Sequence, residues 1–590
     1  MKSRLSFSSL PLRACCLFAF AVLPFALGQR SSGPARSADQ SSNQAAPSAR
    51  LDAWRIIGPG GGGALFHAAI NPLNPRMMLF SCDMGGNYIS KDGGATWRMF
   101  NLWTSNSFAF DPKNANVVLA YGAGMVWRSE NAGDSWRLIS PQPSSIAGLN
   151  FSDEEGGLQV VTQGWRDSIR AVAFDPGSST TLYGVNGSEA LISQDGGKNW
   201  RSLSNGNVNV KGVFKILVDA EAGARGKTVY FIARDRVFTY SNGKMAANPP
   251  VLPKAWITDA AEGSGAGKSA LYLITGQSFT PDGNVIGGLM VSHDDGASWA
   301  QANGALFADL ANKWVVAEAR AIAVDPHNPD LVYLSFSHLT RKSDPANTNF
   351  GVARSTDGGK SWSFPWMSSD RSDPANVHDV WISQHFGPDW GENPLTMDLD
   401  PADTKILLSG DLGRCMRSTD AGANWYGCYS TLLPDGTFTT NGIDVNVAYN
   451  VYFDPFDAQR MFIANTDIGL FRSENGGRSW ASASASVPFR WRNATYALAF
   501  DPAVRGRVWA AMSNRHDLPL ARVLHFDPAT YKGAIVVSNN GGKSWMKSGE
   551  LPEAAYTDIQ IDGSAASSSS GPGNRVLYAC AIGHGIFKSS

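Results

Sequence analysis

The chain lacks an excess of either charge, since 50 Lys and Arg residues stand against 51 Asp and Glu residues for a formal net charge of −1. Nucleic acids and anionic membrane surfaces are usually bound by basic patches, so this balance supports neither partner. Cysteine and histidine are also scarce, at six and nine residues, and none of them has the spacing of zinc ligands. We therefore expect no nucleic-acid partner, no metal and no other cofactor.

The N-terminus has the features of a secretory signal peptide. Lys2, Arg4 and Arg13 precede an apolar stretch over residues 14–27, and residues 26–28 (Ala-Leu-Gly) fit a small-residue cleavage site. A short membrane anchor is the alternative, but no stop-transfer pattern follows the stretch. The sequence therefore predicts an exported protein that does not stay in the membrane after cleavage.

Three regions follow from composition. Residues 1–28 form the predicted signal peptide, and residues 29–50, rich in Ser, Ala and Pro, form a predicted disordered linker. Residues 51–590 form one repeat region, because repeat proteins do not divide into domains of ordinary length. We expect a secreted or periplasmic monomer.

One eight-residue phrase occurs eight times in the repeat region. It has Ser first, Asp or Asn two positions later, Gly two beyond that and Trp at the end. Such a phrase is typical of a hairpin turn, because Asp, Asn and Ser bond nearby backbone amides and Gly tolerates positive φ. The Trp is expected to fill an apolar gap. The copies are residues 90–97, 129–136, 193–200, 292–299, 355–362, 418–425, 473–480 and 538–545.

Short apolar strands alternate with these turns, and many end in Asp-Pro, as at residues 108–112 and 172–176. Each module is predicted to be a four-stranded antiparallel blade. Two further modules, at residues 216–243 and 559–589, lack the Trp phrase, which gives ten modules in total. An orphan strand at residues 52–58 resembles the strand that follows each phrase, and it could complete the last module.

The predicted fold is therefore an all-β propeller of about ten four-stranded blades in one ring, closed by the N-terminal strand. Two smaller propellers facing each other are the alternative. The repeated phrase resembles the Asp-box, or bacterial neuraminidase repeat, of sialidases, family 74 glycoside hydrolases and sortilin-type receptors. In these families the box lies on the propeller rim, away from the chemistry, and ten modules match the ring size of sortilin-type propellers.

The opening of the repeat region resembles the family 74 glycoside hydrolases, the xyloglucanases and related endoglucanases. It carries a glycine run at residues 58–63 and the phrase Ser-Cys-Asp-Met-Gly-Gly-Asn-Tyr at residues 81–88. This resemblance implies that Asp83 is one of two catalytic carboxylates. The second role falls on Asp411 in Gly-Asp-Leu-Gly-Arg, and Asp467 in Thr-Asp-Ile-Gly-Leu is a rival. Each phrase also fits an ordinary turn between strands.

Two acids are required by the chemistry of an inverting glycosidase. One carboxyl group protonates the leaving oxygen and the other activates water, with the two groups about 6.5–9.5 Å apart. The sequence does not say which residue is the acid. Asp83 and Asp411 would stand on opposite sides of a single large ring, so a single ring would weaken this pairing.

Sugar sites also need aromatic platforms. The insertion at residues 377–392 departs from the repeat and carries Trp381, His385 and Trp390, which we predict to bind substrate together with Tyr88. An ordinary surface loop with buried Trp residues is the alternative.

Four cysteines remain after the predicted cleavage. Cys415 and Cys428 lie at equal distances on either side of a box and should face each other on neighbouring strands, so a disulfide is predicted between them. Cys82 and Cys580 occupy equivalent places in modules one and ten, and their pairing is left open.

Sialidase activity is not supported, because the Phe/Tyr-Arg-Ile-Pro phrase of that family is missing and the nearest string, at residues 488–492, lacks Ile-Pro. The sequence favours a secreted glycoside hydrolase that acts on a β-glucan or xyloglucan-like polysaccharide by a two-carboxylate inverting mechanism. The alternative is a noncatalytic, sortilin-like propeller that binds protein, peptide or glycan.

Overall fold

A computed structural model describes residues 55–589 except 85, 103–105, 152–157, 164–167, 204–206, 220–225, 254–255, 283, 305, 307–314, 392–393, 519, 521–526 and 563–574. All of the described residues except Arg55 belong to one compact unit, Ile56–Ser590. The predicted signal peptide, the predicted linker and Trp54 of the orphan strand lie outside the described residues.

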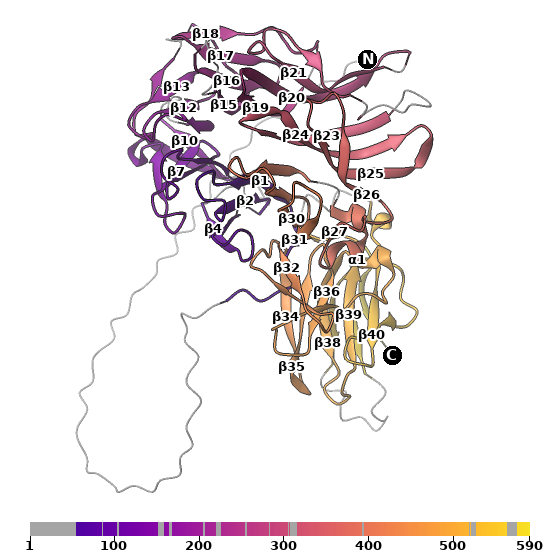
Figure 1. Ribbon diagram of the computed structural model, residues 1–590. Helices are drawn as coiled ribbons and strands as arrows, with labels where there is room; N and C mark the ends of the chain where they lie inside the picture. Colours follow the sequence, from indigo (N-terminus) through magenta and orange to yellow (C-terminus); the bar gives the residue numbers. More distant parts are fainter. Residues whose placement is uncertain are drawn as a thin grey trace, which may run out of the picture. The chain divides into compact units, whose positions relative to one another are not determined.

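Seven antiparallel sheets come first along the chain, and in each the strands pair in sequence order (Figure 1). The seventh sheet has a parallel fifth strand, β27, beside β31. The strands are β1 (Leu65–Ile70), β2 (Met78–Cys82), β3 (Gly86–Ser90), β4 (Arg98–Asn101); β5 (Ser107–Phe110), β6 (Val118–Gly122), β7 (Met125–Ser129), β8 (Arg137–Ser140); β11 (Ala171–Phe174), β12 (Leu182–Val185), β13 (Ala190–Ser193), β14 (Arg201–Ser202); β15 (Val213–Asp219), β16 (Thr228–Ala233), β17 (Val237–Ser241), β18 (Lys244–Ala247); β19 (Ile257–Gly265), β20 (Lys268–Phe279), β21 (Val285–Ser292), β22 (Ala300–Gln301); β23 (Val315–Asp325), β24 (Asn328–Arg341), β25 (Asp344–Ser355), β26 (Ser363–Ser369); and β27 (Val377–His378), β28 (Thr396–Leu399), β29 (Leu407–Gly410), β30 (Cys415–Ser418), β31 (Trp425–Gly427).

Three more sheets follow, and the last has three strands among the described residues. Two small hairpins and a few short helices lie in the connections. The strands are β34 (Ala448–Asp454), β35 (Asp457–Asn465), β36 (Leu470–Ser473), β37 (Ala481–Ser482); β38 (Ala494–Phe500), β39 (Val508–Ser513), β40 (Gly533–Ser538), β41 (Met546–Lys547); and β42 (Tyr556–Ile561), β43 (Leu577–Ala581), β44 (Gly585–Lys588). The connections hold β9 (Ile146–Phe151) with β10 (Leu158–Thr162), β32 (Ser430–Leu432) with β33 (Phe438–Thr440), α1 (Ile382–Phe386) and 3₁₀ turns at Pro143–Ser145, Pro388–Gly391, Phe489–Trp491 and Pro528–Thr530. This nearly all-β series of four-stranded sheets is the architecture of a β-propeller.

The first strands of the seven leading sheets contact one another in order, and β28 of the seventh sheet contacts β1 of the first. β1 is an edge strand of its sheet and contains a β-bulge between Phe66 and Ala69, so some of its backbone N–H groups point away from the ladder, and the seventh sheet accepts them. The N–H of Ala68 donates to Thr396 Oγ1 at 2.9 Å, and the N–H of Ile70 donates to Asp398 Oδ2 at 2.7 Å. The seven sheets therefore close on themselves, which differs from the single ring of ten modules expected from the sequence.

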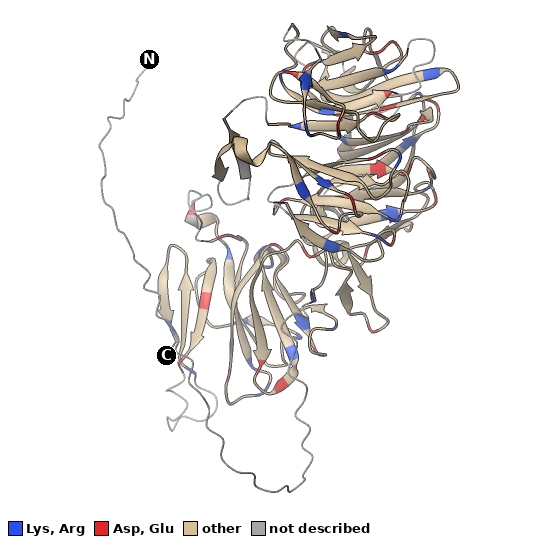
Figure 2. Cartoon of the chain, turned by 90° about the vertical axis from the view of Figure 1, so that its left-hand side faces the viewer, with Lys and Arg blue, Asp and Glu red and all other residues tan. Residues whose placement is uncertain are grey.

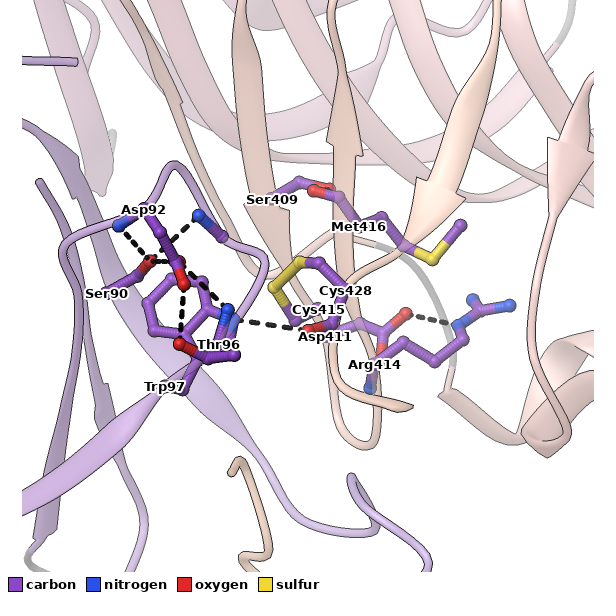
Figure 3. The surroundings of a disulfide bond; sticks show 11 residues. Ser90, Asp92, Thr96, Trp97, Ser409, Asp411, Arg414, Cys415, Met416 and Cys428 are labelled. Carbon is purple, nitrogen blue, oxygen red and sulfur yellow. Dashed lines mark hydrogen bonds and ion pairs between the residues drawn. A yellow bond between two sulfur atoms is a disulfide. The ribbon is translucent and has the colours of Figure 1, made fainter. Parts of the chain in front are cut away.

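The Trp-containing phrases form the predicted hairpin turns. In the first copy, Ser90 Oγ accepts the N–H of Gly94 at 2.8 Å, and Asp92 Oδ1 accepts the N–H of Thr96 at 2.9 Å (Figure 3). The indole N–H of Trp97 donates to the carbonyl of Cys428 in the seventh sheet at 3.1 Å. This bond supports the same closure from the opposite edge of the sheets.

Other Trp residues of the phrase also reach into the preceding sheet. Trp362 donates to the carbonyl of Ala302, and Trp545 donates to that of Ala483. Trp97 donates in the same way to a carbonyl of the seventh sheet, so the seventh sheet is the neighbour of the first. The phrase thus joins neighbouring sheets as well as turning the chain.

A disulfide joins Cys415 and Cys428, the pair that the sequence predicts, with an S–S distance of 2.07 Å and a Cα–Cα distance of 5.3 Å (Figure 3). It lies across the hairpin of the seventh sheet, beside the carbonyl that receives Trp97. Cys82 and Cys580, both in the described part of the chain, are not joined by a disulfide. Their sheets are not neighbours, because the first sheet contacts the seventh.

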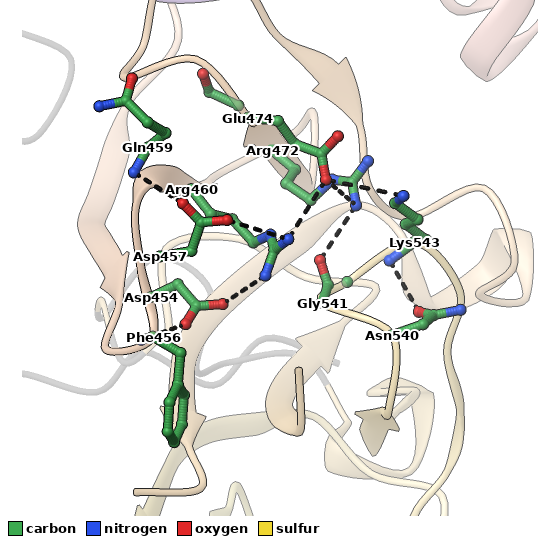
Figure 4. A network of polar contacts seen from close by, with 12 residues as sticks. Asp454, Phe456, Asp457, Gln459, Arg460, Arg472, Glu474, Asn540, Gly541 and Lys543 are labelled. Carbon is green, nitrogen blue, oxygen red and sulfur yellow. Dashed lines mark hydrogen bonds and ion pairs between the residues drawn. The ribbon is translucent and has the colours of Figure 1, made fainter. Parts of the chain in front are cut away.

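The eighth and ninth sheets are joined by a network of ion pairs (Figure 4). Arg460 Nη1 contacts Asp454 Oδ2 at 2.9 Å, and Glu474 Oε1 lies 3.5 Å from Arg472 Nη1 and 3.9 Å from Lys543 Nζ. Glu474 and Lys543 are exposed to solvent, so the pair between them, which crosses from the eighth sheet to the ninth, contributes little to the free energy of unfolding.

Candidate functional site

The turns between second and third strands lie at one edge of the sheets, and the Trp-containing turns between third and fourth strands lie at the other, because the strands are antiparallel. Asp83, Asp411, Asp467 and His516 all lie on or beside second-to-third turns. The long connections between successive sheets reach the same edge. This edge, opposite the boxes, gathers the candidate residues.

Asp83 lies directly after β2 at the surface of the first sheet. Its backbone N–H donates to the carbonyl of Ala64 at 3.3 Å. Partial burial raises the pKa of its carboxyl group, nearby backbone amides offset part of that rise, and the negative charge of Asp467 raises the pKa further. Asp83 and Asp467 therefore lie near enough for one charge to act on the other.

Asp467 lies in the turn between β35 and β36 of the eighth sheet, and its side chain is 38% exposed. Its φ of 54° is in the left-handed region, which Asp adopts more readily than most residues. One carboxylate oxygen contacts Nδ1 of His516 and also accepts a 3.4 Å hydrogen bond from Asn493 Nδ2. The acid is therefore held by its neighbours while part of it remains open to solvent.

The glycine segment, residues 58–63, lies between the ring and the eighth sheet and leads directly to Asp83's partner Ala64. The N–H of Gly61 donates to the carbonyl of Ile443 at 2.6 Å, and the N–H of Gly62 donates to that of Gly413 at 3.0 Å. Gly61 has a φ of 77°, and a Cβ there would lie 2.6 Å from the Gly413 oxygen. Only glycine fits this close passage.

Asp411 is placed differently from Asp83 and Asp467. Its side chain is 1% exposed and forms a 2.7 Å ion pair with Nε of Arg414, whose side chain is fully buried (Figure 3). Asp411 Oδ1 also accepts the N–H groups of Gly413 at 2.9 Å and Arg414 at 2.6 Å. Through these bonds the Asp411 carboxylate holds the turn that carries it, and almost none of the carboxylate reaches solvent.

The predicted substrate-binding residues fall into two groups. Tyr88 and Trp381 are 1% and 3% exposed, so they have no free face for a sugar. The hydroxyl of Tyr88 donates to the carbonyl of Asp444 at 3.0 Å, and the indole N–H of Trp381 donates to the carbonyls of Pro59 and Gly60 at 3.2 Å each. Both side chains therefore hold the glycine segment and its neighbours.

His385 and Trp390 are half-buried. The His385 ring lies within hydrogen-bond distance of the hydroxyl groups of Ser482 and Ser484. Burial lowers its pKa to about 4, and Arg492 lowers it further, so the ring is neutral near pH 7. Trp390 stacks on Phe386 with centroids 4.9 Å apart, and part of it remains exposed beside the turn of Asp411.

Three residues near the acids were not singled out from the sequence. Asp444 accepts the N–H of Gly60 at 3.0 Å, and burial raises its pKa to about 6. His516 contacts Asp467, and its other ring nitrogen lies 3.7 Å from a carboxylate oxygen of Asp517. His516 could have been identified from its position in the repeat, because it follows the second strand of the ninth sheet just as Asp467 follows that of the eighth.

Basic and acidic residues are scattered over the sheets (Figure 2). Among the described residues, no group of three or more His, Cys, Asp or Glu side chains could hold a metal ion. No helix in the described part of the chain is long and apolar enough to cross a bilayer.

The fold and the acids at this edge define a β-propeller chain that resembles the family 74 glycoside hydrolases. The chain is 23% identical over 428 residues to the oligoxyloglucan-reducing end-specific xyloglucanase of Emericella nidulans, covering 61% of this chain and 51% of that protein. It is also 23% identical over 437 residues to the xyloglucanase Xgh74A of Acetivibrio thermocellus, covering 66% and 48% respectively. The chain thus spans about half the length of these curated relatives.

The fold is shared with a solved structure of a family 74 enzyme. The crystal structure of an ancestral family 74 enzyme (GH74) superposes with a TM-score of 0.63 at 18% identity, over 92% of this chain and 69% of that one. No family model matches the chain.

Proposed function

We propose that the protein is a secreted glycoside hydrolase that cleaves xyloglucan or a related β-glucan, with Asp83 and Asp467 as its two catalytic acids. The observation that carries the proposal is that both residues follow the second strands of their sheets at the edge opposite the boxes, where the charge of Asp467 adds to the rise in the pKa of Asp83. The printed activities of the curated relatives support xyloglucan as the substrate class.

Asp467 takes the role that the sequence analysis assigned first to Asp411. Asp411 is enclosed and bound to Arg414, whereas both Asp83 and Asp467 reach solvent. A catalytic carboxyl group must come within hydrogen-bond distance of the substrate or of the attacking water. In this proposal Asp411 and Arg414 act as positioning residues for the turn that contacts the glycine segment.

The raised pKa of Asp83 suits it to the role of general acid. Asp83 gives its proton to the glycosidic oxygen as the bond from the anomeric carbon to that oxygen breaks. Asp467 takes a proton from the water that attacks the anomeric carbon from the opposite face, so the configuration inverts. The contact with His516 holds the Asp467 carboxylate in place for this step.

The three C-terminal sheets belong, in this proposal, to a second propeller, and the polysaccharide lies where they meet the seven-sheet ring. The glycine segment supports this arrangement, because it bonds to Gly413 of the ring and to Ile443 before the eighth sheet. The chain acts as a monomer after signal cleavage, and it needs no metal or other cofactor.

The test is release of reducing ends from tamarind-type xyloglucan and from mixed-linkage β-glucan. Asp83→Asn and Asp467→Asn should each reduce kcat by roughly 10²–10⁴-fold, the usual contribution of a general acid or base. Asp134→Asn, which alters an exposed carboxylate paired with Lys91, is the matched control and should retain full activity. Proton NMR of the first product should show the inverted anomer.

The noncatalytic alternative makes a different prediction for the same assay. A propeller that only binds glycan or peptide would release no reducing ends, and the two Asn variants would behave like the wild type. Equal activity of Asp467→Asn and wild type, together with loss in a folded Asp411→Asn variant, would return the second role to Asp411.

A further inference from the structure

A cavity of about 540 Å³ lies at the centre of the seven-sheet ring, away from the turn that carries Asp467. Its walls come from the first strands of six sheets, β1, β5, β15, β19, β23 and β28. This volume is within the range of about 300–1,000 Å³ that is usual for small-molecule sites. The centre of the ring therefore has room for a ligand the size of one or two sugar units.

The polar groups of the cavity are matched in charge. Lys215 Nζ lies 2.8 Å from Asp259 Oδ1, while the other oxygen of Asp259 accepts the N–H of Ile322 at 3.1 Å. Asp398 accepts two backbone N–H groups, one of them from Ile70 in the first sheet. Burial and the charge of Lys215 lower the pKa of His67 to about 4, so its ring is neutral near pH 7.

Lys215 is paired with Asp259, and Asp398 is held by backbone N–H groups, so the cavity offers donors and acceptors without a cluster of one sign. A free anion or cation would leave part of this arrangement uncompensated. A neutral ligand with many hydroxyl groups could bond to both kinds of group. Between the polar groups, Phe66, Phe108, Phe110 and Phe214 supply apolar surface for the C–H faces of such a ligand.

An exposed aromatic side chain, Trp256, contacts one of the residues that line the cavity. Arg234, in the turn between β16 and β17, lines the cavity and places its guanidinium carbon 4.0 Å from the ring centroid of Phe214 and 5.5 Å from that of Trp256. Arg234 Nη1 also donates to the carbonyl of Ile257 at 3.1 Å. Trp256 is 60% exposed although it is held from one side by the cation.

We propose that this cavity is a second glycan-binding site, which takes a neutral sugar unit with Trp256 as stacking platform and Arg234, Lys215 and Asp259 as hydrogen-bonding partners. It opens at the edge that also carries Asp83, since both Asp83 and Arg234 follow the second strands of their sheets. The choice of sugar rests on the proposed function, but the place of the site does not. It would hold an end or a branch of the polysaccharide away from the bond that is cleaved.

Binding is measured by isothermal titration and ligand-observed NMR on the full chain carrying Asp83→Asn, so that no substrate is consumed. The probes are D-xylose, D-glucose, D-galactose and the xyloglucan heptasaccharide, with inorganic phosphate as the charged comparison. We expect saturable binding of at least one sugar and none of phosphate. Trp256→Ala should weaken that binding by at least tenfold, about 1.4 kcal/mol.

Phe453→Ala is the matched control, because Phe453 is 63% exposed but lies on β34 of the eighth sheet. It should bind the sugar as tightly as the parent chain. Arg234→Lys keeps the charge but loses the planar group between Phe214 and Trp256, so it should weaken binding with an unchanged unfolding transition.

Equal affinity of Trp256→Ala and the parent chain would overturn the site, as would tighter binding of phosphate or no sugar binding at any accessible concentration. Failure of the proposed function reads differently. If the chain binds sugar through Trp256 but releases no reducing ends, the proposed second site stands and the proposed hydrolase activity fails. If the chain hydrolyses xyloglucan and Trp256→Ala binds sugar as tightly as the parent chain, the proposed hydrolase activity stands and the proposed second site fails.

Discussion

The seven-sheet ring and the three C-terminal sheets differ in how completely their strands and apolar side chains are covered by neighbouring sheets. In the ring every first strand has neighbours on both sides, and β28 meets β1. In the C-terminal set, β34 exposes Val451 and Phe453, at 48% and 63%, and β44 exposes Ile586 at 73%. The ring is therefore held by its own closure, whereas the three sheets depend on their contacts with the ring and with each other.

The two regions meet in one hydrophobic cluster. Phe80 and Leu408 of the ring share it with Phe438, Ile463 and Trp480 before and within the eighth sheet. Each region also supplies one of the two proposed catalytic acids. The boundary between closed and open sheets is therefore where we expect substitutions to have their largest effects on activity.

Gly61→Ala should give the largest effect. An added Cβ would lie 2.6 Å from the Gly413 oxygen, and the φ of 77° disfavours any residue but glycine. The displaced segment would change the separation of Asp83 and Asp467, and a shift of about 1 Å can reduce a rate by roughly 100-fold. Xyloglucan hydrolysis measures the loss, with Gly243→Ala, where the space around the added Cβ is open, as control for positive φ alone. Similar losses in both variants would contradict this account.

Arg414→Ala should have the next largest effect, on stability. It leaves the buried Asp411 carboxylate without its ion-pair partner, which typically costs about 3–5 kcal/mol. Urea unfolding followed by tryptophan fluorescence measures the change. Lys91→Ala removes an exposed partner of Asp134 and should change the unfolding free energy by less than about 1 kcal/mol. A small effect of Arg414→Ala would show that the ring closes without this pair.

Asp398 gives the ring a pH dependence of moderate size. Burial raises its pKa to about 6, so between about pH 4 and 6 the folded chain holds a proton that the unfolded chain has released. Its contribution to the free energy of unfolding therefore falls as pH rises through this window, by about 1–3 kcal/mol in total. Asp398→Asn should flatten this part of the stability profile. Asp444, also with a pKa raised to about 6, contributes the same sign, so the wild-type slope should fall only in part.

Glu474→Gln should have the smallest effect. Glu474 is 47% exposed and lies 3.5–3.9 Å from Arg472, Arg460 and Lys543 in the network between the eighth and ninth sheets. Exposed pairs contribute about 0–1 kcal/mol each. Unfolding in 0.05 M and 1 M salt measures the change in the free energy of unfolding, and the difference from wild type should vanish at high salt. A loss well above 1 kcal/mol would mean that the open sheets rely on this network.

Local features of the fold were predictable because they depend on a few adjacent residues. The Ser, Asp and Gly of residues 90–94 are sufficient to form a turn, and the structure has that turn. The partner of the first sheet was not predictable, because it depends on how Asp398 and Thr396 meet the bulge in β1, more than 300 residues away. No repeat pattern carries that information.

The candidate site also combines features that could be predicted from the sequence with features that could not. The phrase around Asp411 resembles the phrase around Asp467, and only the buried position of Arg414 separates an acid that holds its own turn from one that reaches solvent. Tyr88 and Trp381 have the residue types of a sugar platform and also those of a core. Their burial decides between the two, and it depends on the glycine segment for Trp381 and on the bond to Asp444 for Tyr88.

The glycine segment has a consequence for the order in which the molecule is made. Gly60 and its partner Asp444 are 384 positions apart in the chain. At roughly 5–20 residues per second, a ribosome would take on the order of 20–80 s to produce the second after the first. The other partners of the segment, Trp381 and Gly413, also appear late in that interval, so the two acids come together only when most of the chain has been synthesised.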